Sequence, residues 1–488
     1  VPGEREAYVE AAAAPSGASP APAAPIQRVA REATPAIGQV SNVDFPAVER
    51  AALSNGIEVV YARSTTVPVT RVALEFDAGV AADSADRLGA HTLMLNVMQE
   101  GTTTRDSKAL AEAQERLGAS VSVGSSMDRT SASLSTVTTN LQPSLTLLSD
   151  MVRNPAFAPA EVERLRAQRL AGLANEKTQP AAIAARALPP LIYGEGHPYG
   201  RSFSGSGDEA VIRGLTRADL AAEHARWIRP DNAKLFVVSD LPLAELKPQL
   251  EAAFGDWRAP TTAKGAKSFN AALPQTSARI VLIDRPQSPQ SLIYGGQVLP
   301  VSGTDDLLTL TTANTVLGAD FLSRINADLR ETKGWSYGVR GNVSTMQNRS
   351  PYIVNAPVQA NRTGESIAAL IGQYERFLGA DGVTKAERDR TVLGDTRGLS
   401  GSYETSAQVL GALRSNALYG RPDGYQEALA GRINALTAQQ MDAAARAAID
   451  PAKFVWVVVG DASVVKPQLD ALGLPVEVRS APAPTTAQ

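Results

Sequence analysis

Apolar and small polar residues alternate in several short runs along the first half of the chain. Ser120–Gly124 reads Ser-Val-Ser-Val-Gly, and Thr130–Val137 continues the same alternation. Successive side chains of a strand point to opposite faces, so these runs predict antiparallel strands with one solvated face. Longer apolar runs at 233–240 and 452–461 predict further strands.

The second half of the chain repeats the order of elements found in the first. Leu-Lys-Pro-Gln-Leu at 246–250 follows one apolar run, and Val-Lys-Pro-Gln-Leu at 465–469 follows the other. A proline near the start of a helix loses no hydrogen bond, so both copies predict a strand, an acidic turn and a helix. The other matching segments are strands at 57–61 and 279–284, strands at 71–76 and 290–295, helices near 88–98 and 306–317, and helices at 216–228 and 437–449.

This internal repeat predicts an α+β protein with two homologous domains, each a mainly antiparallel sheet packed by helices. The expected parts are an Ala/Pro-rich lead-in at 1–42, a first domain at 43–258, a linker at 259–276, a second domain at 277–478 and a tail at 479–488.

One segment of the second half combines a helical pattern with polar groups suited to ligand binding. Its apolar positions are Leu322, Ile325 and Leu329, which predict a helix up to the break at Gly334. Arg330 falls in the last turn, and Tyr337 falls in a short extended run after the break. The reversal can bring guanidinium and phenol together, where the two could bind a carbonyl oxygen. The spacing alone favours the simpler interpretation of a helix-end arginine and a half-buried tyrosine.

Composition narrows the possible partners. The chain has 47 basic and 50 acidic residues, a net charge of −3 and no basic run, so neither nucleic acid nor an acidic membrane surface is expected as a partner. No apolar stretch approaches the roughly 20 residues that span a bilayer. The sequence contains no cysteine, which excludes disulfides and thiolate metal sites.

The region 11–37 is rich in alanine and proline, and the sequence begins at Val1. Such a composition predicts a flexible lead-in, as found after a cleaved signal peptide. We therefore expect an exported, periplasmic protein, with a cytoplasmic linker as the alternative.

Several motifs stand in the order typical of the pitrilysin-type (insulinase) zinc peptidases. They include Gly118-Ala-Ser-Val-Ser, Gly196-His-Pro-Tyr-Gly-Arg201 and Leu329-Arg-Glu-Thr-Lys-Gly-Trp-Ser-Tyr-Gly338. The chain resembles this family over nearly all of 43–478. The resemblance implies that its two domains form half of a clamshell.

Active members of that family carry an inverted zinc motif, His-x-x-Glu-His, and a distal Glu ligand. Anchored on Gly101-Thr102, the histidine positions hold Thr92 and Asn96 here, and the general-base position holds Leu95. The distal position falls at 170–173, where there is no carboxylate. The resemblance therefore implies that this chain has no catalytic residue and binds no metal.

The chain has only three histidines, and no two of them are close in sequence. We expect His91 to be a helix-surface or packing residue, His197 to be structural in the His-Pro-Tyr-Gly turn, and His224 to be solvated surface. The edge-strand motif Asn-Ala-x-Thr of active members is replaced by Ser122–Ser125, which makes substrate contacts from the first half doubtful.

The resemblance implies a zinc-free subunit of a heterodimeric metallopeptidase. A homologous partner subunit would bind zinc, peptides would be the substrates, and Arg330 and Tyr337 would bind the substrate carbonyl in the partner's active site. Two alternatives remain: a purely structural subunit, like the family's core proteins of respiratory complexes, and a periplasmic peptide-binding protein.

Overall fold

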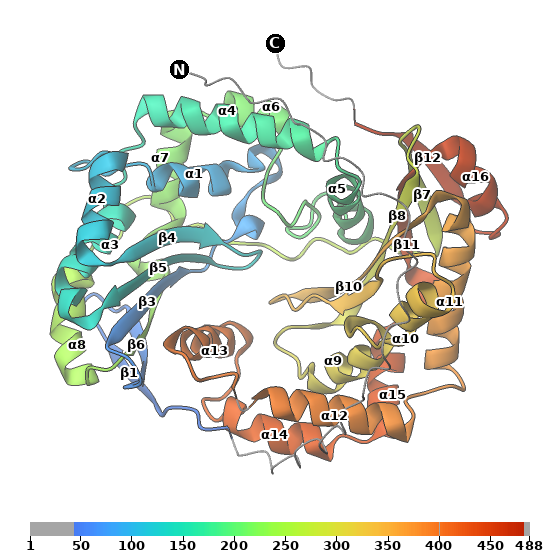
Figure 1. The fold of residues 1–488 in the computed structure, drawn as a ribbon. Helices are drawn as coiled ribbons and strands as arrows, with labels where there is room; N and C mark the ends of the chain where they lie inside the picture. The colour runs from blue at the N-terminus through green and yellow to red at the C-terminus, as the bar shows by residue number, and fades with distance from the viewer. Residues whose placement is uncertain (1–42, 400, 483–488) are drawn as a thin grey trace, which may run out of the picture. The chain divides into compact units, whose positions relative to one another are not determined.

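The computed structural model describes residues 43–399 and 401–482, so the lead-in and residues 483–488 of the predicted tail lie outside the described residues. Figure 1 shows two sheets, each packed by helices. The first contains β1 (Val48–Ala52), β2 (Glu58–Arg63), β3 (Val69–Phe76), β4 (Ser120–Ser125), β5 (Thr130–Val137) and β6 (Ala233–Ser239) in the order β1-β2-β6-β3-β5-β4. The second contains β7 (Arg279–Asp284), β8 (Gln290–Ser302), β9 (Arg340–Val343), β10 (Arg349–Gln359), β11 (Val455–Gly460) and β12 (Val476–Ser480) in the order β12-β7-β11-β8-β10-β9.

The two sheets follow the same plan. In the first sheet, β6 lies between β2, with which it pairs in parallel, and β3, with which it pairs antiparallel. In the second sheet, β11 lies in the same way between β7 and β8. The other pairings within this shared plan are antiparallel, and β12 adds a parallel edge strand to the second sheet. The predicted α+β fold with two homologous halves is confirmed.

The helices also correspond between the halves. Those of the first are α1 (Ala90–Met98), α2 (Ser107–Leu117), α3 (Leu141–Arg153), α4 (Pro159–Glu176), α5 (Pro180–Tyr193), α6 (Glu209–Gly214), α7 (Arg217–Trp227) and α8 (Leu243–Leu250). Those of the second are α9 (Leu308–Asn314), α10 (Arg324–Asn326), α11 (Thr363–Leu378), α12 (Lys385–Leu399), α13 (Ser406–Tyr419), α14 (Tyr425–Ala435), α15 (Ala438–Ala448) and α16 (Ala462–Asp470). The equivalent helices α7 and α15 both begin with a capping box, formed by Thr216 with Asp219 and by Thr437 with Gln440.

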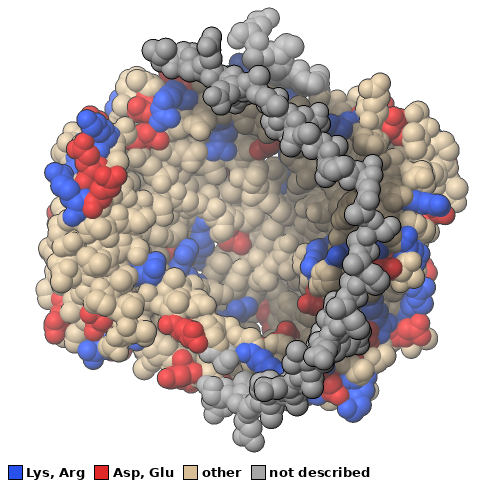
Figure 2. Space-filling model, viewed as in Figure 1, with Lys and Arg blue, Asp and Glu red and all other residues tan. Residues whose placement is uncertain are grey.

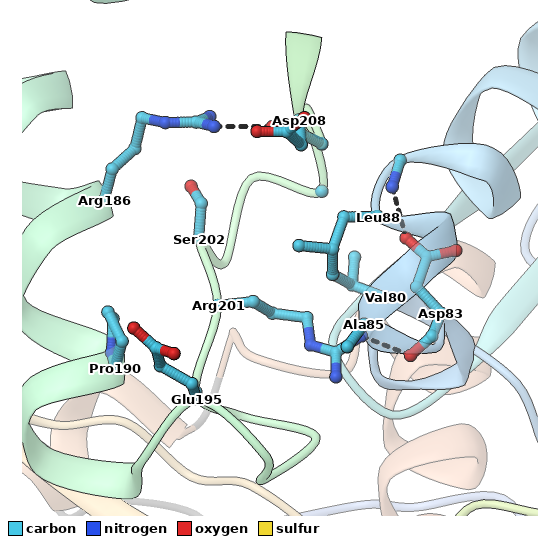
Figure 3. A pocket seen from close by; sticks show the side chains of 14 residues that line it. Val80, Asp83, Ala85, Leu88, Arg186, Pro190, Glu195, Arg201, Ser202 and Asp208 are labelled. Atoms are coloured by element: carbon cyan, nitrogen blue, oxygen red, sulfur yellow. Dashed lines mark hydrogen bonds between the residues drawn. The ribbon is translucent and has the colours of Figure 1, made fainter. Parts of the chain in front are cut away.

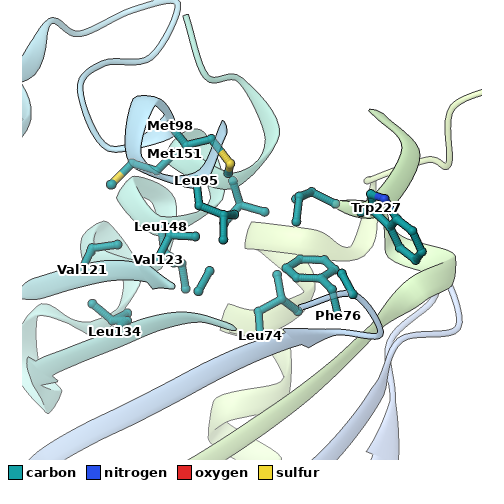
Figure 4. Close-up of a cluster of buried hydrophobic side chains, with 14 of the residues drawn as sticks. Leu74, Phe76, Leu95, Met98, Val121, Val123, Leu134, Leu148, Met151 and Trp227 are labelled. Carbon is teal, nitrogen blue, oxygen red and sulfur yellow. The ribbon is translucent and has the colours of Figure 1, made fainter. Parts of the chain in front are cut away.

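The main core of the first half lies between its sheet and a layer of helices that includes α1 and α3. Figure 4 shows Leu74 and Phe76 of β3 pointing toward side chains from these helices. Helix α1 contributes Leu95 and Met98, and both are almost completely buried.

Each half also covers the opposite face of the other half's sheet. Helix α5 of the first half packs on β8 and β11, where Leu188 joins Val457 in one buried cluster. Helix α13 of the second half packs on β3 and β6, where Leu413 joins Phe236. Arg414 of α13 donates to the buried carboxylate of Glu75 at 2.5 Å, so a charged bond accompanies the apolar contact.

The segment predicted as a linker has no helix or strand, but it is packed against the first half. The Lys267 ammonium donates to the carbonyl oxygens of Ala78 and Asp128 at 3.0 and 2.6 Å. Phe269 makes edge contacts with the rings of His197 and Tyr199. At the other boundary, β12 continues into the first two residues of the predicted tail.

The charges on the described surface and the apolar character of the described helices match what the composition led us to expect. On the face in Figure 2, Lys and Arg are interspersed with Asp and Glu over the part formed by described residues. Within 43–399 and 401–482, none of the helices has the length and apolar character needed to cross a bilayer.

Candidate functional site

The positions that correspond to the zinc motif lie on α1, where protein groups fill the space. The Thr92 hydroxyl donates a short hydrogen bond to the carbonyl of Gly205. A side chain at Gly205 would approach Thr92 and Val80 to 2.8 Å, so only glycine fits this close approach. The segment around Gly205 therefore covers the first histidine position.

The second histidine position is paired with an arginine. With its amide oriented to satisfy both groups, Asn96 accepts a hydrogen bond from the Arg169 guanidinium at 2.9 Å and donates to the Thr92 carbonyl at 3.3 Å. Burial lowers the pKa of Arg169, against the opposing attraction of Glu176 and Asp83. A protein cation thus lies beside the position where the family would place a metal ligand.

The general-base and distal positions are apolar. Leu95 points into the core among Met98, Leu148 and Met151 (Figure 4). Leu173, in the distal stretch, is buried in the same core. A carboxylate or imidazole at these positions would have to displace packed hydrocarbon, which is costly.

A pocket of about 330 Å³ opens beside the start of α1 (Figure 3). Asp83 lines it, and its carboxylate accepts hydrogen bonds from the backbone amides of Gly89 and His91 at 2.6 and 3.0 Å. Burial raises the pKa of Asp83 to about 6. Arg201 donates to the Asp83 carbonyl, so the polar groups here hold the loops together.

These residues do not fit a zinc ion. Among the residues that the structure describes, no three His, Asp or Glu side chains are grouped closely enough to hold a metal. Thr92 and Asn96 are satisfied by protein partners, and neither offers the imidazole that zinc prefers.

The three histidines have structural contacts. His91 is fully buried, with one ring nitrogen 3.1 Å from Glu223 and the other 2.6 Å from the Thr130 hydroxyl, so it is a packing residue. His197 accepts a hydrogen bond from the Tyr199 amide at 3.0 Å, as expected for a turn histidine, and burial lowers its pKa to about 4.

The prediction for His224 was wrong. Its ring is 2.8 Å from the Val152 carbonyl and packs edge-on against Phe157, and burial lowers its pKa. Its neighbour Glu223 is also buried. His224 was predicted on a solvated surface because its partners Val152 and Phe157 lie on distant segments.

Strand β4 contains the replaced edge motif and lies at the edge of its sheet. Side chains cap its outward backbone groups: Gln99 bonds both the amide and the carbonyl of Val123 at 3.2 Å, and Gln114 accepts from the amide of Val121 at 2.8 Å. An extended peptide would need these same groups to join the sheet.

The helix predicted through Leu322 differs in the structure. Helix α10 begins only at Arg324, and the chain then widens into a π-helix, η7 (Ala327–Thr332), that contains Arg330. Leu322 precedes the helix and is 56% exposed, whereas Ile325 and Leu329 are buried as predicted. A second π-helix, η6 (Thr315–Ala319), lies just before this segment. Such π-turns are frequent at functional sites.

The backbone of residues 329–338, here called the Arg/Tyr loop, is fixed by hydrogen bonds. The Trp335 amide donates to the Leu329 carbonyl at 2.9 Å, and its carbonyl accepts from Gln359 at 3.1 Å. The Ser336 hydroxyl donates to the Pro357 carbonyl at 2.6 Å. These hydrogen bonds attach the loop to the end of β10.

The two side chains proposed to bind a ligand both reach solvent. Tyr337 is 90% exposed, and no hydrogen bond or ion pair joins it to another described residue. The Arg330 side chain is 35% exposed, lies 3.4 Å from Glu331 and has its guanidinium carbon 4.3 Å from the centre of the Phe321 ring. In the described part of the chain, no hydrogen bond joins Arg330 to Tyr337. The guanidinium N–H groups and the phenol hydroxyl can therefore donate to a ligand.

Two residues of the site were missed by the sequence reasoning. Arg169 lies one residue before the distal stretch, and nothing in the local pattern indicates that it pairs with Asn96. Phe321 is an aromatic outside the buried helical periodicity, and this break in the pattern was a usable signal.

Comparisons with known proteins agree with the duplicated fold. Residues 58–201 match the description "Insulinase (Peptidase family M16)", and residues 214–393 match "Peptidase M16 inactive domain". An uncharacterized zinc protease of Mycobacterium tuberculosis is 24% identical over 407 residues, which are 82% of this chain and 90% of that protein. A Helicobacter pylori protein described as a non-peptidase homolog is 20% identical over 336 residues, 68% of this chain and 75% of its own.

A solved structure shows the same fold. The crystal structure of a peptidase M16 inactive domain from Pseudomonas fluorescens has a TM-score of 0.78 and 27% identity, and the match covers 85% of this chain and 98% of that one. With both halves matched and the strand order duplicated, the chain belongs to the M16 (insulinase, or pitrilysin-type) peptidase family.

Proposed function

We propose that this chain is the zinc-free subunit of a heterodimeric, periplasmic zinc metallopeptidase that cleaves peptides. The match to the M16 inactive domain and the non-peptidase relative support a non-catalytic member of the family. We propose a heterodimer because protein groups fill the metal position of this chain while the side chain of Tyr337 in its Arg/Tyr loop is exposed. The compartment rests on the Ala/Pro-rich composition of residues 11–37.

The proposal depends mainly on the exposure of Tyr337. Its phenol is 90% exposed, and hydrogen bonds fix the backbone of the loop that contains it. A fixed backbone lowers the entropy that binding would cost. Arg330, in the adjoining π-turn, adds a permanent positive charge with several donors. Together they suit a carbonyl oxygen that gains negative charge as it is attacked.

The peptide itself would be held by the partner subunit. The outward groups of β4 are already bonded to Gln99 and Gln114, so this strand has no free edge at those positions. The partner would bind zinc, supply the attacking water and add the peptide to its own sheet edge. This chain would contribute only the charge of Arg330 and the hydroxyl of Tyr337.

The test begins with the homologous subunit from the same organism that carries an intact His-x-x-Glu-His motif. The two chains are co-expressed and co-purified, zinc is measured, and a fluorogenic peptide reports cleavage. We expect one zinc per heterodimer and activity only in the complex. Arg330→Ala should lower turnover on the order of a hundredfold, and Tyr337→Phe should lower it less.

Arg116→Ala is the matched control, since Arg116 is an exposed arginine at the end of α2. A partner that cleaves equally fast alone contradicts the proposal. A complex whose activity is unchanged by Arg330→Ala supports a purely structural subunit instead. Peptide binding by this chain alone, without any partner, supports a peptide-binding protein.

A further inference from the structure

Phe321 lies where the chain passes from η6 to α10, and it places an aromatic ring beside Arg330. The guanidinium carbon of Arg330 is 4.3 Å from the ring centre, well within the range of a cation–π contact. Phe321 is 46% exposed, so its ring is not a core residue. The cation–π contact with Arg330 is the aromatic interaction that the described residues give this ring.

The turn that carries Phe321 is held in place. The Phe321 carbonyl accepts a hydrogen bond from the Asn326 side chain at 2.6 Å, and Asn326 is buried. The Asp320 carboxylate accepts from the Leu322 amide at 2.8 Å. Asn326 also accepts from the Val339 amide at 2.8 Å, just beyond the Arg/Tyr loop. One buried amide thus links the turn of Phe321 to the end of that loop.

The kind of contact matters for the chemistry of Arg330. A carboxylate partner would occupy the N–H groups of the guanidinium, because an ion pair with arginine is made through those donors. The only carboxylate near Arg330 among the described ion pairs is that of Glu331, which is 62% exposed and lies 3.4 Å from Nε, so the contact does not involve the two terminal NH₂ groups. An aromatic face attracts the cation electrostatically and uses none of its N–H groups as hydrogen-bond donors.

We propose that Phe321 is a positioning residue for Arg330: its ring holds the guanidinium in place and leaves the N–H donors available for a substrate carbonyl. This inference rests on the proposed function for its catalytic consequence. The cation–π contact itself is a property of this chain alone, so the two can be tested separately.

The contact is tested on the isolated chain by NMR of the arginine side-chain Nε–Hε groups. The Arg330 signal is assigned by its loss in Arg330→Lys. We expect a ring-current shift of this signal that is kept in Phe321→Tyr and lost in Phe321→Leu, which retains an apolar side chain without an aromatic face. A signal that is the same in wild type and Phe321→Leu overturns the inference, whatever the partner does.

The consequence is tested in the heterodimer. Phe321→Leu should lower kcat/KM about two- to fivefold, mainly through kcat, and Phe321→Tyr should restore it. In the Arg330→Ala background, Phe321→Leu should cause no further loss, because the residue acts through the arginine. An unchanged kcat/KM in Phe321→Leu, or an equal loss in both backgrounds, overturns the inference while a large effect of Arg330→Ala still supports the proposed function. If Arg330→Ala itself has no effect, the proposed function fails.

Discussion

Rebuilding the zinc motif in this chain is expected to destabilise it strongly rather than to create a metal site. The variant is Thr92→His, Leu95→Glu, Asn96→His. Leu95 is 1% exposed, so its replacement loses about 1.5–3 kcal/mol of buried apolar contact. The new carboxyl has no partner in that core, which costs about 1–3 kcal/mol even when it is protonated. The sum is a large part of the roughly 5–15 kcal/mol that stabilises a typical domain.

The measurement is urea unfolding followed by tryptophan fluorescence, together with zinc content after dialysis. The double variant Thr92→His, Asn96→His, which leaves Leu95 in place, is the control and should be clearly more stable than the triple variant. A triple variant that holds one zinc per chain and unfolds at the wild-type urea concentration would refute the reasoning, because it would mean that the core can open to admit the ion.

Three further predictions concern stability and association. The folded state favours neutral His197, because its pKa falls from 6.5 to about 4, so the free energy of unfolding should decrease as the pH falls below about 6.5. Between pH 7.5 and pH 5 the loss should be about 2 kcal/mol. Urea unfolding of His197→Asn should lack this part of the pH dependence. Arg414→Ala leaves the buried carboxylate of Glu75 without its charged partner and should lower the free energy of unfolding by about 1.5–3 kcal/mol, seen as a lower Tm; an unchanged Tm would contradict this account. Replacing Gln99 and Gln114 by Leu frees the outward backbone groups of β4 and should promote strand-to-strand association, measured by light scattering, whereas a variant that stays monomeric would show that other groups protect this edge.

The fold could be predicted because its signals are local and occur twice. Alternation identified β4 and β5, and the repeated Lys-Pro-Gln-Leu segments identified the strand and helix late in each half. The predicted helix starts were wrong, because Pro248 and Pro467 lie inside α8 and α16. The capping boxes at Thr216 and Thr437 mark the starts of α7 and α15 in the sequence itself. Such features depend on neighbours within a few residues, so one sequence is enough to find them.

The site was less predictable because its contacts join distant segments. The pairing of Asn96 with Arg169 depends on how α4 lies against α1, and the burial of His224 depends on Val152 and Phe157. The helix through Leu322 was extended too far because an apolar residue at helical spacing was counted as part of the buried face. The π-helix that contains Arg330 could not be predicted, because the spacing of apolar residues in the sequence is the same as in an α-helix.

The exchange of α5 and α13 between the halves makes each half depend on the other. Cut between its halves, the protein would expose the apolar surface of both sheets that the opposite helix now shields, and each fragment would be prone to aggregate. We therefore expect neither half to be stable as a separate chain. The two halves are therefore expected to unfold together, because loss of structure in one half uncovers the sheet of the other.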